Sequence, residues 1–382
     1  MKNTVALTLA SYLSMLFLGV ASSLIGGAAR NIGLEPIQIG LMITVQNFGF
    51  MTAVLLSGAI SDVHEKPKIL LFGSLLLAAG FLAFYRFEPF WINVVIMFAI
   101  GLGIGTYEGV TDAMLLDIHK NKGALHININ HFFVTTGSIL ITLYLIYLQV
   151  DWRKSITQSS LIILILALIY ATSRLQRQNT PSSPVLKRLI NLSRDKLVIA
   201  FFIATLLVVG VETGTVGIMT TFLMELRGFT QITSKIGLLV FLFGIATGRI
   251  IIGTLIPKNK IVNILLVLLV AGVLIFSVMY YSDAGCWIYP IAFLAGGAIS
   301  AILPLMLAYA GQVHEGSAGS VLGIIKVAIP IGGILIPSLF AFFQKLTTFQ
   351  KTLGIYPLAL LITILALISY QKSLTKINDR SV

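Results

Sequence analysis

Cysteine, charge and acidic side chains are all scarce in this sequence. Cys286 is the single cysteine among 382 residues, so no disulfide can form within the chain and a thiolate metal site is excluded. Only 10% of the residues are charged, against about 25% in a typical soluble domain. The chain also lacks a Gly-Lys-Ser phosphate loop and any segment polar enough to form a separate soluble domain. We therefore expect neither an enzyme nor a bound cofactor or metal.

Hydrophobic residues are abundant and make up 57% of the chain. A helix needs about 20 consecutive apolar residues to cross a membrane. The first candidate span is too long for a cleaved signal peptide. We expect an all-α integral membrane protein with twelve transmembrane helices, over Thr4–Ala29, Ile37–Ser61, Ile69–Tyr85, Phe90–Leu116, Ala124–Leu148, Ile156–Thr172, Leu197–Leu226, Ile232–Ile256, Ile261–Tyr281, Trp287–Ala310, Ala318–Phe343 and Leu353–Tyr370.

The 26 lysines and arginines outnumber the 14 acids, and their distribution predicts the topology. With the N-terminus inside, sixteen lie in inner loops and tails, eight in outer loops and span ends, and two within spans. Cytoplasmic loops of membrane proteins carry such an excess. We therefore expect both termini in the cytoplasm, a location in the cell membrane, and anionic lipids as the partners of the basic residues, with no nucleic-acid partner.

A polar segment near the middle of the chain predicts two halves. We expect residues 175–196 to form a cytoplasmic linker between a six-helix bundle over residues 1–174 and a second over residues 197–382. Part of this linker is basic and amphipathic, with Leu186 and Ile190 suited to the membrane surface and Lys187 and Arg188 suited to lipid phosphates. A flexible connector without function is the alternative.

The second half repeats the first at an offset of 195 residues. This offset pairs Gly101 with Gly296, and the run that begins at Gly137 with the run that begins at Gly332. Two pseudo-symmetric six-helix bundles with the solute site between them are the expected arrangement.

The stretch from Gly101 to Ser138 combines close helix packing with buried charge. Gly101, Gly105 and Gly109 recur every four residues, which lets a neighbouring helix approach this backbone closely. Glu108 and Asp112 share a face of the same helix, one turn apart. Carboxylates at membrane depth usually mark a transport path, and the second negative charge should make one of the two take up a proton more readily. A pair satisfied by neighbouring hydroxyls and amides is the alternative.

Further polar groups lie in other predicted spans. His131 and Lys326 are equivalent under the offset of 195, and we expect both to face the solute cavity. Glu212 is the carboxylate that we expect to pair with Lys326, either as part of the mechanism or as a structural ion pair. Amides at three further positions are expected to bond across helices or to bind solute, and these are Asn128, Gln46 and Asn47.

The loop after the second predicted span carries Gly58, Asp62, Lys66 and Lys68, and this pattern resembles a gating motif of the major facilitator superfamily. That family usually has arginine where Val63 stands. Arg249, at the inner end of the eighth span, is assigned to the same gate. The resemblance implies the major facilitator fold, in which a solute site between two helix bundles opens alternately to the two sides of the membrane.

Within that superfamily the sequence is most similar to the fucose, galactose and glucose proton symporters. The segment GTYEGVTDA resembles their fourth span, with Asp112 where they have asparagine, and NINHFFVTTGSI from Asn128 resembles their fifth. The resemblance implies proton coupling at Glu108 and solute contact at His131. The fucose type has an aspartate in its first span and this chain does not, so Glu212 and Asp112 are the other candidate proton carriers.

The expected function is therefore secondary active transport by alternating access, coupled to protons, of a sugar or another small polar solute. Two alternatives stay open, namely a small organic anion neutralised by Lys326 and export of amphiphiles or drugs. We expect a monomer whose partners are its solute, protons and membrane lipids.

Overall fold

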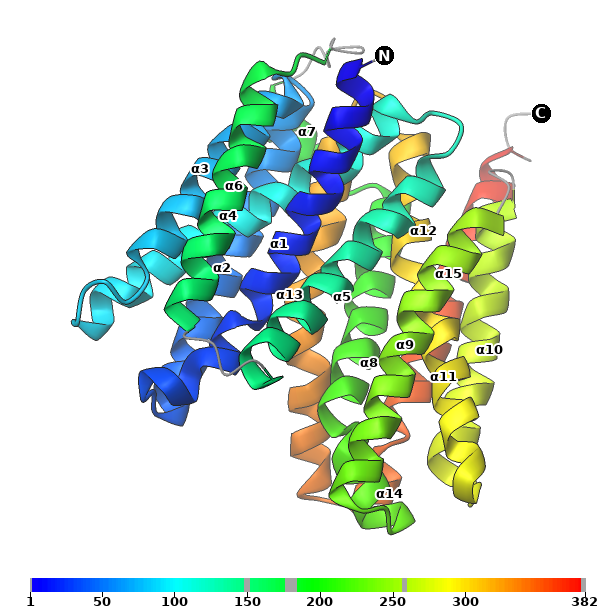
Figure 1. Ribbon diagram of the computed structural model, residues 1–382. Coiled ribbons are helices and arrows are strands. Elements are labelled where there is room, and N and C mark those ends of the chain that lie inside the picture. Colours follow the sequence, from blue (N-terminus) through cyan, green and yellow to red (C-terminus); the bar gives the residue numbers. More distant parts are fainter. Residues whose placement is uncertain (1, 148–151, 176–183, 256–259, 379–382) are drawn as a thin grey trace. The chain divides into compact units, whose positions relative to one another are not determined.

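The computed structural model describes residues 2–147, 152–175, 184–255 and 260–378, which are helical over nearly their whole length (Figure 1). Eleven helical segments of the described residues are long and apolar enough to cross a membrane, and the remaining predicted span, the fifth at Ala124–Leu148, corresponds to α5. The helices are α1 (Lys2–Ile32), α2 (Pro36–Ser61), α3 (Lys66–Ala83), α4 (Phe90–Ile118), α5 (Gly123–Tyr147), α6 (Trp152–Thr172), α7 (Val185–Leu192), α8 (Lys196–Arg227), α9 (Gln231–Leu255), α10 (Ile261–Tyr281), α11 (Ile288–Ser300), α12 (Ile302–Val313), α13 (Ala318–Gln344), α14 (Phe349–Thr352) and α15 (Ile355–Asn378).

The helix ends follow local sequence signals. Pro36 is the first residue of α2 and Pro67 the second residue of α3, positions where the missing N–H would have no intrahelical partner. The Asp195 carboxylate accepts hydrogen bonds from the backbone N–H groups of Leu197 and Val198 and so caps α8. Gly228 ends α8 in the left-handed conformation that favours glycine. The predicted tenth span differs from the prediction because it is interrupted at Ala301, between α11 and α12.

The chain forms two compact units that do not follow the predicted halves at every point. The first unit contains Met1–Leu192 and Ala310–Lys326, and the second contains Ser193–Tyr309 and Val327–Val382. The boundaries within α12 and α13 assign the start of α13 to the first unit. The first boundary, after Leu192, falls inside the predicted linker, whose residues 176–183 lie outside the described part. The division at 175–196 stays a prediction.

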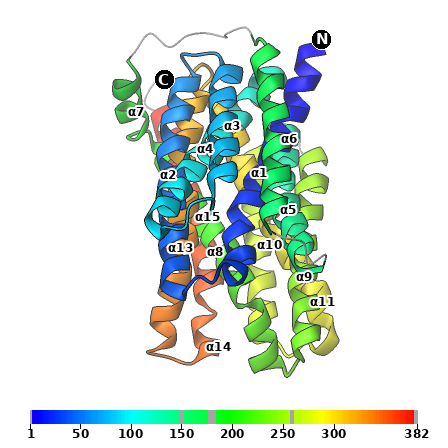
Figure 2. The same ribbon diagram turned by 60° about the vertical axis from the view of Figure 1, so that its left-hand side comes forward.

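In the first unit, α2 and α3 both pack against α4, α6 packs against α3, and α1 packs against α5 (Figure 2). As predicted, a neighbouring helix packs closely against the glycine stripe of α4, and the structure identifies this helix as α2. A side chain at Gly101 would meet the carbonyl oxygen of Gln46, one at Gly105 that of Phe50, and one at Gly109 the Ser57 hydroxyl. Both backbones approach closely because α4 has no Cβ atoms along this stripe.

The second unit repeats this contact. There α9 packs against α11, while α15 packs against α8 and α10. A side chain at Gly49 on α2 would collide with the carbonyl oxygen of Phe98 on α4, and one at Gly244 on α9 would collide with that of Phe293 on α11. Both members of the second pair follow the first by the offset of 195 residues. The repeat read from the sequence is therefore present as equivalent helix contacts within the two units.

Candidate functional site

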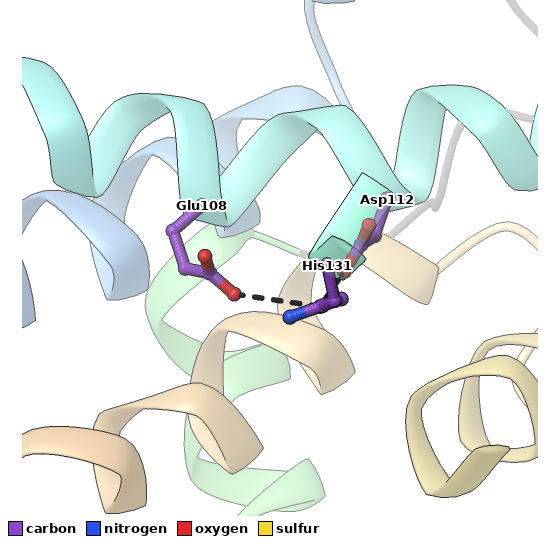
Figure 3. Close-up of side chains that lie close together, drawn as sticks. All are labelled: Glu108, Asp112 and His131. Carbon is purple, nitrogen blue, oxygen red and sulfur yellow. Dashed lines mark hydrogen bonds and ion pairs between the residues drawn. The ribbon is translucent and has the colours of Figure 1, made fainter. Parts of the chain in front are cut away.

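Four ionisable side chains meet inside the first unit, and Figure 3 shows the two acids and the histidine among them. Glu108 and Asp112 come from α4, His131 from α5 and Lys326 from the start of α13. Their residues are between 0% and 5% exposed. We call these four residues the charge cluster. The predicted proximity of Glu108 and Asp112 is present, and two of the predicted solute-binding residues lie against them.

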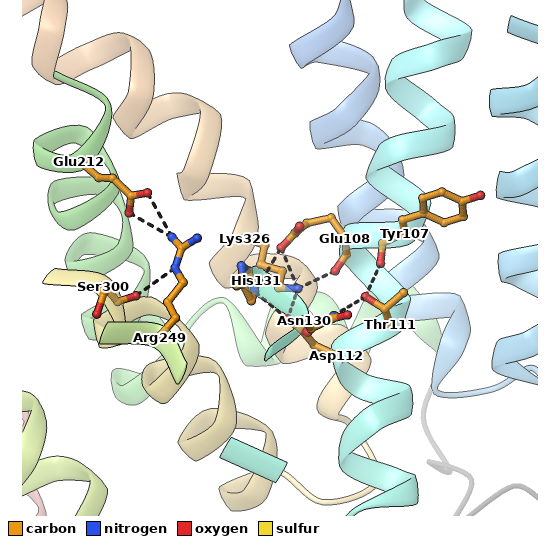
Figure 4. Close-up of polar contacts among 10 residues, drawn as sticks. All are labelled: Tyr107, Glu108, Thr111, Asp112, Asn130, His131, Glu212, Arg249, Ser300 and Lys326. Atoms are coloured by element: carbon orange, nitrogen blue, oxygen red, sulfur yellow. Dashed lines mark hydrogen bonds and ion pairs between the residues drawn. The ribbon is translucent and has the colours of Figure 1, made fainter. Parts of the chain in front are cut away.

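Lys326 lies between the two carboxylates. Its Nζ is 2.6 Å from Asp112 Oδ2 and 2.9 Å from Glu108 Oε1, and it donates a hydrogen bond of 2.6 Å to the backbone oxygen of Glu108 (Figure 4). The Nε2 atom of His131 is 3.0 Å from Asp112 Oδ2 and 3.9 Å from Glu108 Oε1. The like-charge repulsion expected from the spacing of the two acids is therefore offset by a cation placed between them.

The two acids are held differently. Asp112 also accepts a hydrogen bond of 2.7 Å from the side-chain amide of Asn130, which donates to Thr111 as well. Glu108 Oε1 receives no hydrogen bond from the described residues, although the Lys326 ammonium is close enough for an ion pair. Asp112 is thus fixed by three neighbouring side chains, whereas Glu108 is held mainly by charge.

Asn130 is a member of the site that was not among the predicted site residues, which included Asn128 instead. Successive residues two apart on a helix point about 200° apart, so only one of these amides can face α4. The Asn128 amide donates to the backbone oxygen of Ala124 on its own helix. The sequence feature that could have identified Asn130 as a site residue is its position directly before His131.

The expected pairing of Lys326 with Glu212 was wrong. Lys326 contacts Glu108 and Asp112, and Glu212 on α8 pairs with Arg249 on α9. One Arg249 Nη atom donates to both Glu212 oxygens at 3.1 and 3.4 Å, and Nε donates to the backbone oxygen of Ser300 at 3.3 Å (Figure 4). This second ion pair lies within the second unit, and its glutamate side chain is 25% exposed. The sequence indicated that Lys326 and Glu212 lie at a similar depth in the membrane, but it could not show which helices are neighbours.

The other predicted solute-binding amides lie apart from the charge cluster. Gln46 is buried on α2 and donates to the backbone oxygen of Ala21 on α1, which confirms the expected bond across helices. Asn47 follows it on α2 and is half-buried. Solute contact by either amide stays a prediction.

The predicted gating residues fall into three separate contacts. Asp62 accepts hydrogen bonds from the backbone N–H groups of Gly319 and Ser320 and from the Ser320 hydroxyl, at 2.8, 2.9 and 2.5 Å. A side chain at Gly58 would collide with Gly319, so the end of α2 and the start of α13 touch through their backbones. Lys66 pairs with Asp117 on α4 at 2.7 Å. Arg249, assigned to the same gate, instead contacts Glu212 in the second unit.

Burial raises the pKa of the Asp62 carboxyl, and the hydrogen bonds from Ser320 and Gly319 act in the opposite direction. The carboxylate also lies at the positive N-terminal end of α13. These donors provide the neutralisation that a buried acid requires, so Asp62 holds α13 to α2.

Donor atoms of Glu108, Asp112 and His131 lie within 4.8 Å of one another, which is close enough for a metal ion. The Lys326 ammonium already contacts both carboxylates at the distances given above. A metal would have to displace this cation, so the residues present do not fit a resident ion.

A second group of polar side chains joins α1, the end of α4 and α5. The rings of His119 and His126 are stacked with their centroids 3.5 Å apart. His119 Nε2 is hydrogen-bonded to the Thr8 hydroxyl at 2.8 Å, and His126 Nδ1 to the Tyr12 hydroxyl at 2.5 Å. Burial lowers the pKa of His119. An open pocket of about 500 Å³ lies beside this pair and is lined by residues 117–122.

Comparisons with known proteins give the fold. The sequence profile of the Major Facilitator Superfamily matches residues 7–337. A structure of FucP, the fucose:proton symporter of E. coli, in the outward conformation is similar over 97% of this chain and 99% of its own, with a TM-score of 0.79 and 16% identity. The human organic anion transporter MFSD10 is similar over 95% and 99%, with a TM-score of 0.74 and 14% identity. A sequence comparison with curated proteins gave no match.

Proposed function

Because the chain belongs to the major facilitator superfamily, we propose that it couples the movement of a small polar solute to protons through the charge cluster. The family membership makes the protein a membrane transporter and not an enzyme. Proton coupling, the solute and the direction of transport are the proposed part.

The net charge of the cluster carries the proposal. With Lys326 charged and both carboxylates ionised, the cluster has a charge of −1 when His131 is neutral, and one added proton makes it neutral. An uncompensated charge is costly in a site that excludes water. Proton uptake therefore changes the stability of the buried arrangement, which is the differential effect that coupling to a conformational change requires.

Glu108 is the favoured proton acceptor within the cluster. Its Oε1 atom receives no hydrogen bond from the described residues and lies near the His131 ring, whereas Asp112 is held by Lys326, His131 and Asn130. A proton on Glu108 would weaken its attraction to Lys326 and leave the Asp112 contacts in place. We assign Asp112 and Lys326 to positioning, and His131 to proton exchange with Glu108.

A sugar or other small uncharged solute is the favoured cargo. The alternative of an organic anion at Lys326 is weakened because two carboxylates already contact that ammonium. Export of an amphiphile requires a large apolar cavity, and the described cluster is polar and closed. Proton-coupled sugar transport is the function of the fucose and xylose symporters, whose fold the chain shares, but the organic anion transporter MFSD10 has this fold too, so the choice of cargo rests on the charge cluster.

We also propose that both termini lie in the cytoplasm and that the protein is in the cell membrane, on the distribution of lysine and arginine. A monomer stays a prediction. A cysteine placed at the C-terminus, in a Cys286→Ser background, should react with an impermeant maleimide only after the cells are opened. Labelling of intact cells would contradict this topology.

The solute can be found by thermal shift, since a ligand that binds only the folded state stabilises it. Purified protein would be screened against sugars, polyols, carboxylates and amphiphiles. Proteoliposomes would then be tested for accumulation of the stabilising solute under a pH gradient. We expect Glu108→Gln to abolish accumulation while counterflow exchange remains, and Glu88→Gln, which removes an exposed acid, to behave like the wild type.

Two results would contradict proton coupling at this site. One is accumulation by Glu108→Gln at the wild-type level under the pH gradient. The other is accumulation by the wild type under a sodium gradient with no pH difference.

A further inference from the structure

The linker helix α7 carries one arginine that behaves unlike its neighbours. Leu186 and Ile190 are 70% and 45% exposed, and Lys187 is exposed too, as the amphipathic pattern predicts. Arg188 was expected to reach lipid phosphates together with Lys187, and this was wrong, because Arg188 is only 4% exposed. A long cationic side chain that turns away from water and lipid needs partners inside the protein.

The partners of Arg188 come from two other helices. Its Nη2 atom donates a hydrogen bond of 2.7 Å to the backbone oxygen of Ala59, in the last turn of α2. Its Nε atom donates a bond of 2.8 Å to the Ser320 hydroxyl at the start of α13 and lies 3.6 Å from Asp62 Oδ2. One side chain thus joins the linker helix to both sides of the contact between α2 and α13.

These bonds complete the surroundings of Asp62. The backbone N–H groups of α13 and the Ser320 hydroxyl bind its carboxylate, and Arg188 supplies a full positive charge beside it. Arg188 also satisfies a carbonyl of the last turn of α2, which has no partner within its own helix. All of these residues belong to the first unit.

The loop after α2 does not supply such a charge from its own first residue. Val63 directly follows Asp62 and is half-buried. The two lysines of the loop form their ion pairs with other acids, Lys66 with Asp117 and Lys68 with Glu65, and Lys66 also acts on Asp62 through its charge. The guanidinium nearest to Asp62 therefore comes from α7, more than a hundred residues further along the chain.

We propose that Arg188 is a gating residue of the linker helix, which holds Asp62 against the start of α13 in place of an arginine in the loop after α2. The proposal rests on alternating access in the proposed function. Separation of α2 from α13 then requires that α7 first withdraws Arg188, so that the linker controls how often this contact opens.

Ser61 offers a direct probe of the contact. It is 2% exposed, and a side chain on Gly319 would collide with its hydroxyl, so it lies where α2 meets α13. Single-cysteine protein carrying Ser61→Cys and Cys286→Ser would be reconstituted in liposomes. The rate of maleimide labelling would then report opening of the contact without any solute.

Four backgrounds separate the possibilities. We expect Arg188→Gln to increase the labelling rate several-fold, Arg188→Lys to increase it less, and Lys187→Gln, on the exposed face of the same helix, to leave it unchanged. We expect Val63→Arg combined with Arg188→Gln to restore slow labelling, because it returns a guanidinium to Asp62 from the loop. If Arg188 served only to pack α7 against the protein, a guanidinium supplied from the loop after α2 would not give this rescue. If Arg188→Gln does not fold, the lysine variant and the rescued double variant carry the same comparison.

The proposal would be overturned by an Arg188→Gln labelling rate equal to that of Lys187→Gln, or by a double variant as reactive as Arg188→Gln alone. Absence of proton-driven transport in the wild type would contradict the proposed function. It would leave the labelling result intact, so the two failures are distinguishable.

Discussion

The ammonium nitrogen of Lys326 lies 2.6 Å from the carboxylate of Asp112, and both side chains are completely buried. A lysine in the first part of the membrane helix α13 and an acid on the distant helix α4 thereby neutralise each other within one compact unit. The local structure depends on this ion pair, because burying either charge without the other would cost several kcal/mol.

Removal of Lys326 should destabilise the protein strongly. Lys326→Met leaves the carboxylates of Glu108 and Asp112 buried without their cation, and removing one partner of a buried pair typically costs about 3–5 kcal/mol. We expect a large fall in the melting temperature, and partial recovery when Asp112→Asn is added. Lys68→Met, whose side chain is 72% exposed, is the matched control and should change little. A melting temperature for Lys326→Met equal to that of the control would show that the cluster does not depend on its cation.

The ion pair of Glu212 and Arg249 should respond unequally to its two single substitutions. Arg249 is 5% exposed, whereas the Glu212 side chain is 25% exposed and can be partly hydrated. Glu212→Gln leaves a buried guanidinium without its anion and should cost about 1–3 kcal/mol. Arg249→Gln should cost less, because the remaining carboxylate reaches solvent. Thermal melting of both variants and of the double variant would check this, and equal losses would argue against the difference in burial as the cause.

The histidine pair at the end of α4 should make stability dependent on pH. Burial lowers the pKa of His119 below its ordinary value of about 6.5, so the unfolded state binds more protons than the folded state as the pH falls through that value. The protein should therefore lose stability on acidification from about pH 7.5 to pH 5.5. His119 stacks on His126, which faces the Tyr12 hydroxyl and the charge of Lys122.

His119→Gln should remove part of this loss, because glutamine does not titrate. The measurement is the difference in melting temperature between the two pH values, compared with that of His64→Gln, which removes an exposed histidine. A pH dependence unchanged by His119→Gln but reduced by His64→Gln would contradict the assignment.

Packing of α2 against α4 should be sensitive to a single methyl group. A Cβ at Gly105 would meet the carbonyl oxygen of Phe50 and the Cβ of Ala53, so Gly105→Ala should force the helices apart and cost about 1–3 kcal/mol. Gly217→Ala on α8 is the control, because no atom of the described structure lies within 4 Å of its added Cβ. Alanine has the higher helix propensity, so the control should keep or raise the melting temperature. Equal melting temperatures for the two variants would contradict this tight contact.

The membrane-spanning helices and the glycines at their contacts could be predicted from the sequence alone. Apolar runs of sufficient length predict spans because every backbone polar group must be satisfied within the membrane, which leaves the helix as the local solution. The predicted twelve-helix, all-α fold is confirmed, and the repeat of 195 residues reappears in the paired glycine contacts of Gly49 and Gly244. Local spacing also placed Glu108 and Asp112 on one face, since residues four apart on a helix are neighbours.

Only the tertiary structure decided which partners these groups have. The sequence by itself determined that Lys326 needs an anion, but several acids lie in apolar spans, and the chain gives no measure of which helices touch. The same limit applies to Asn130, chosen over Asn128 by the rotation of α5, and to Arg188, whose amphipathic surroundings indicated lipid. Periodicity reports which residues share a face of one helix, whereas the identity of the neighbour opposite depends on how separate helices pack.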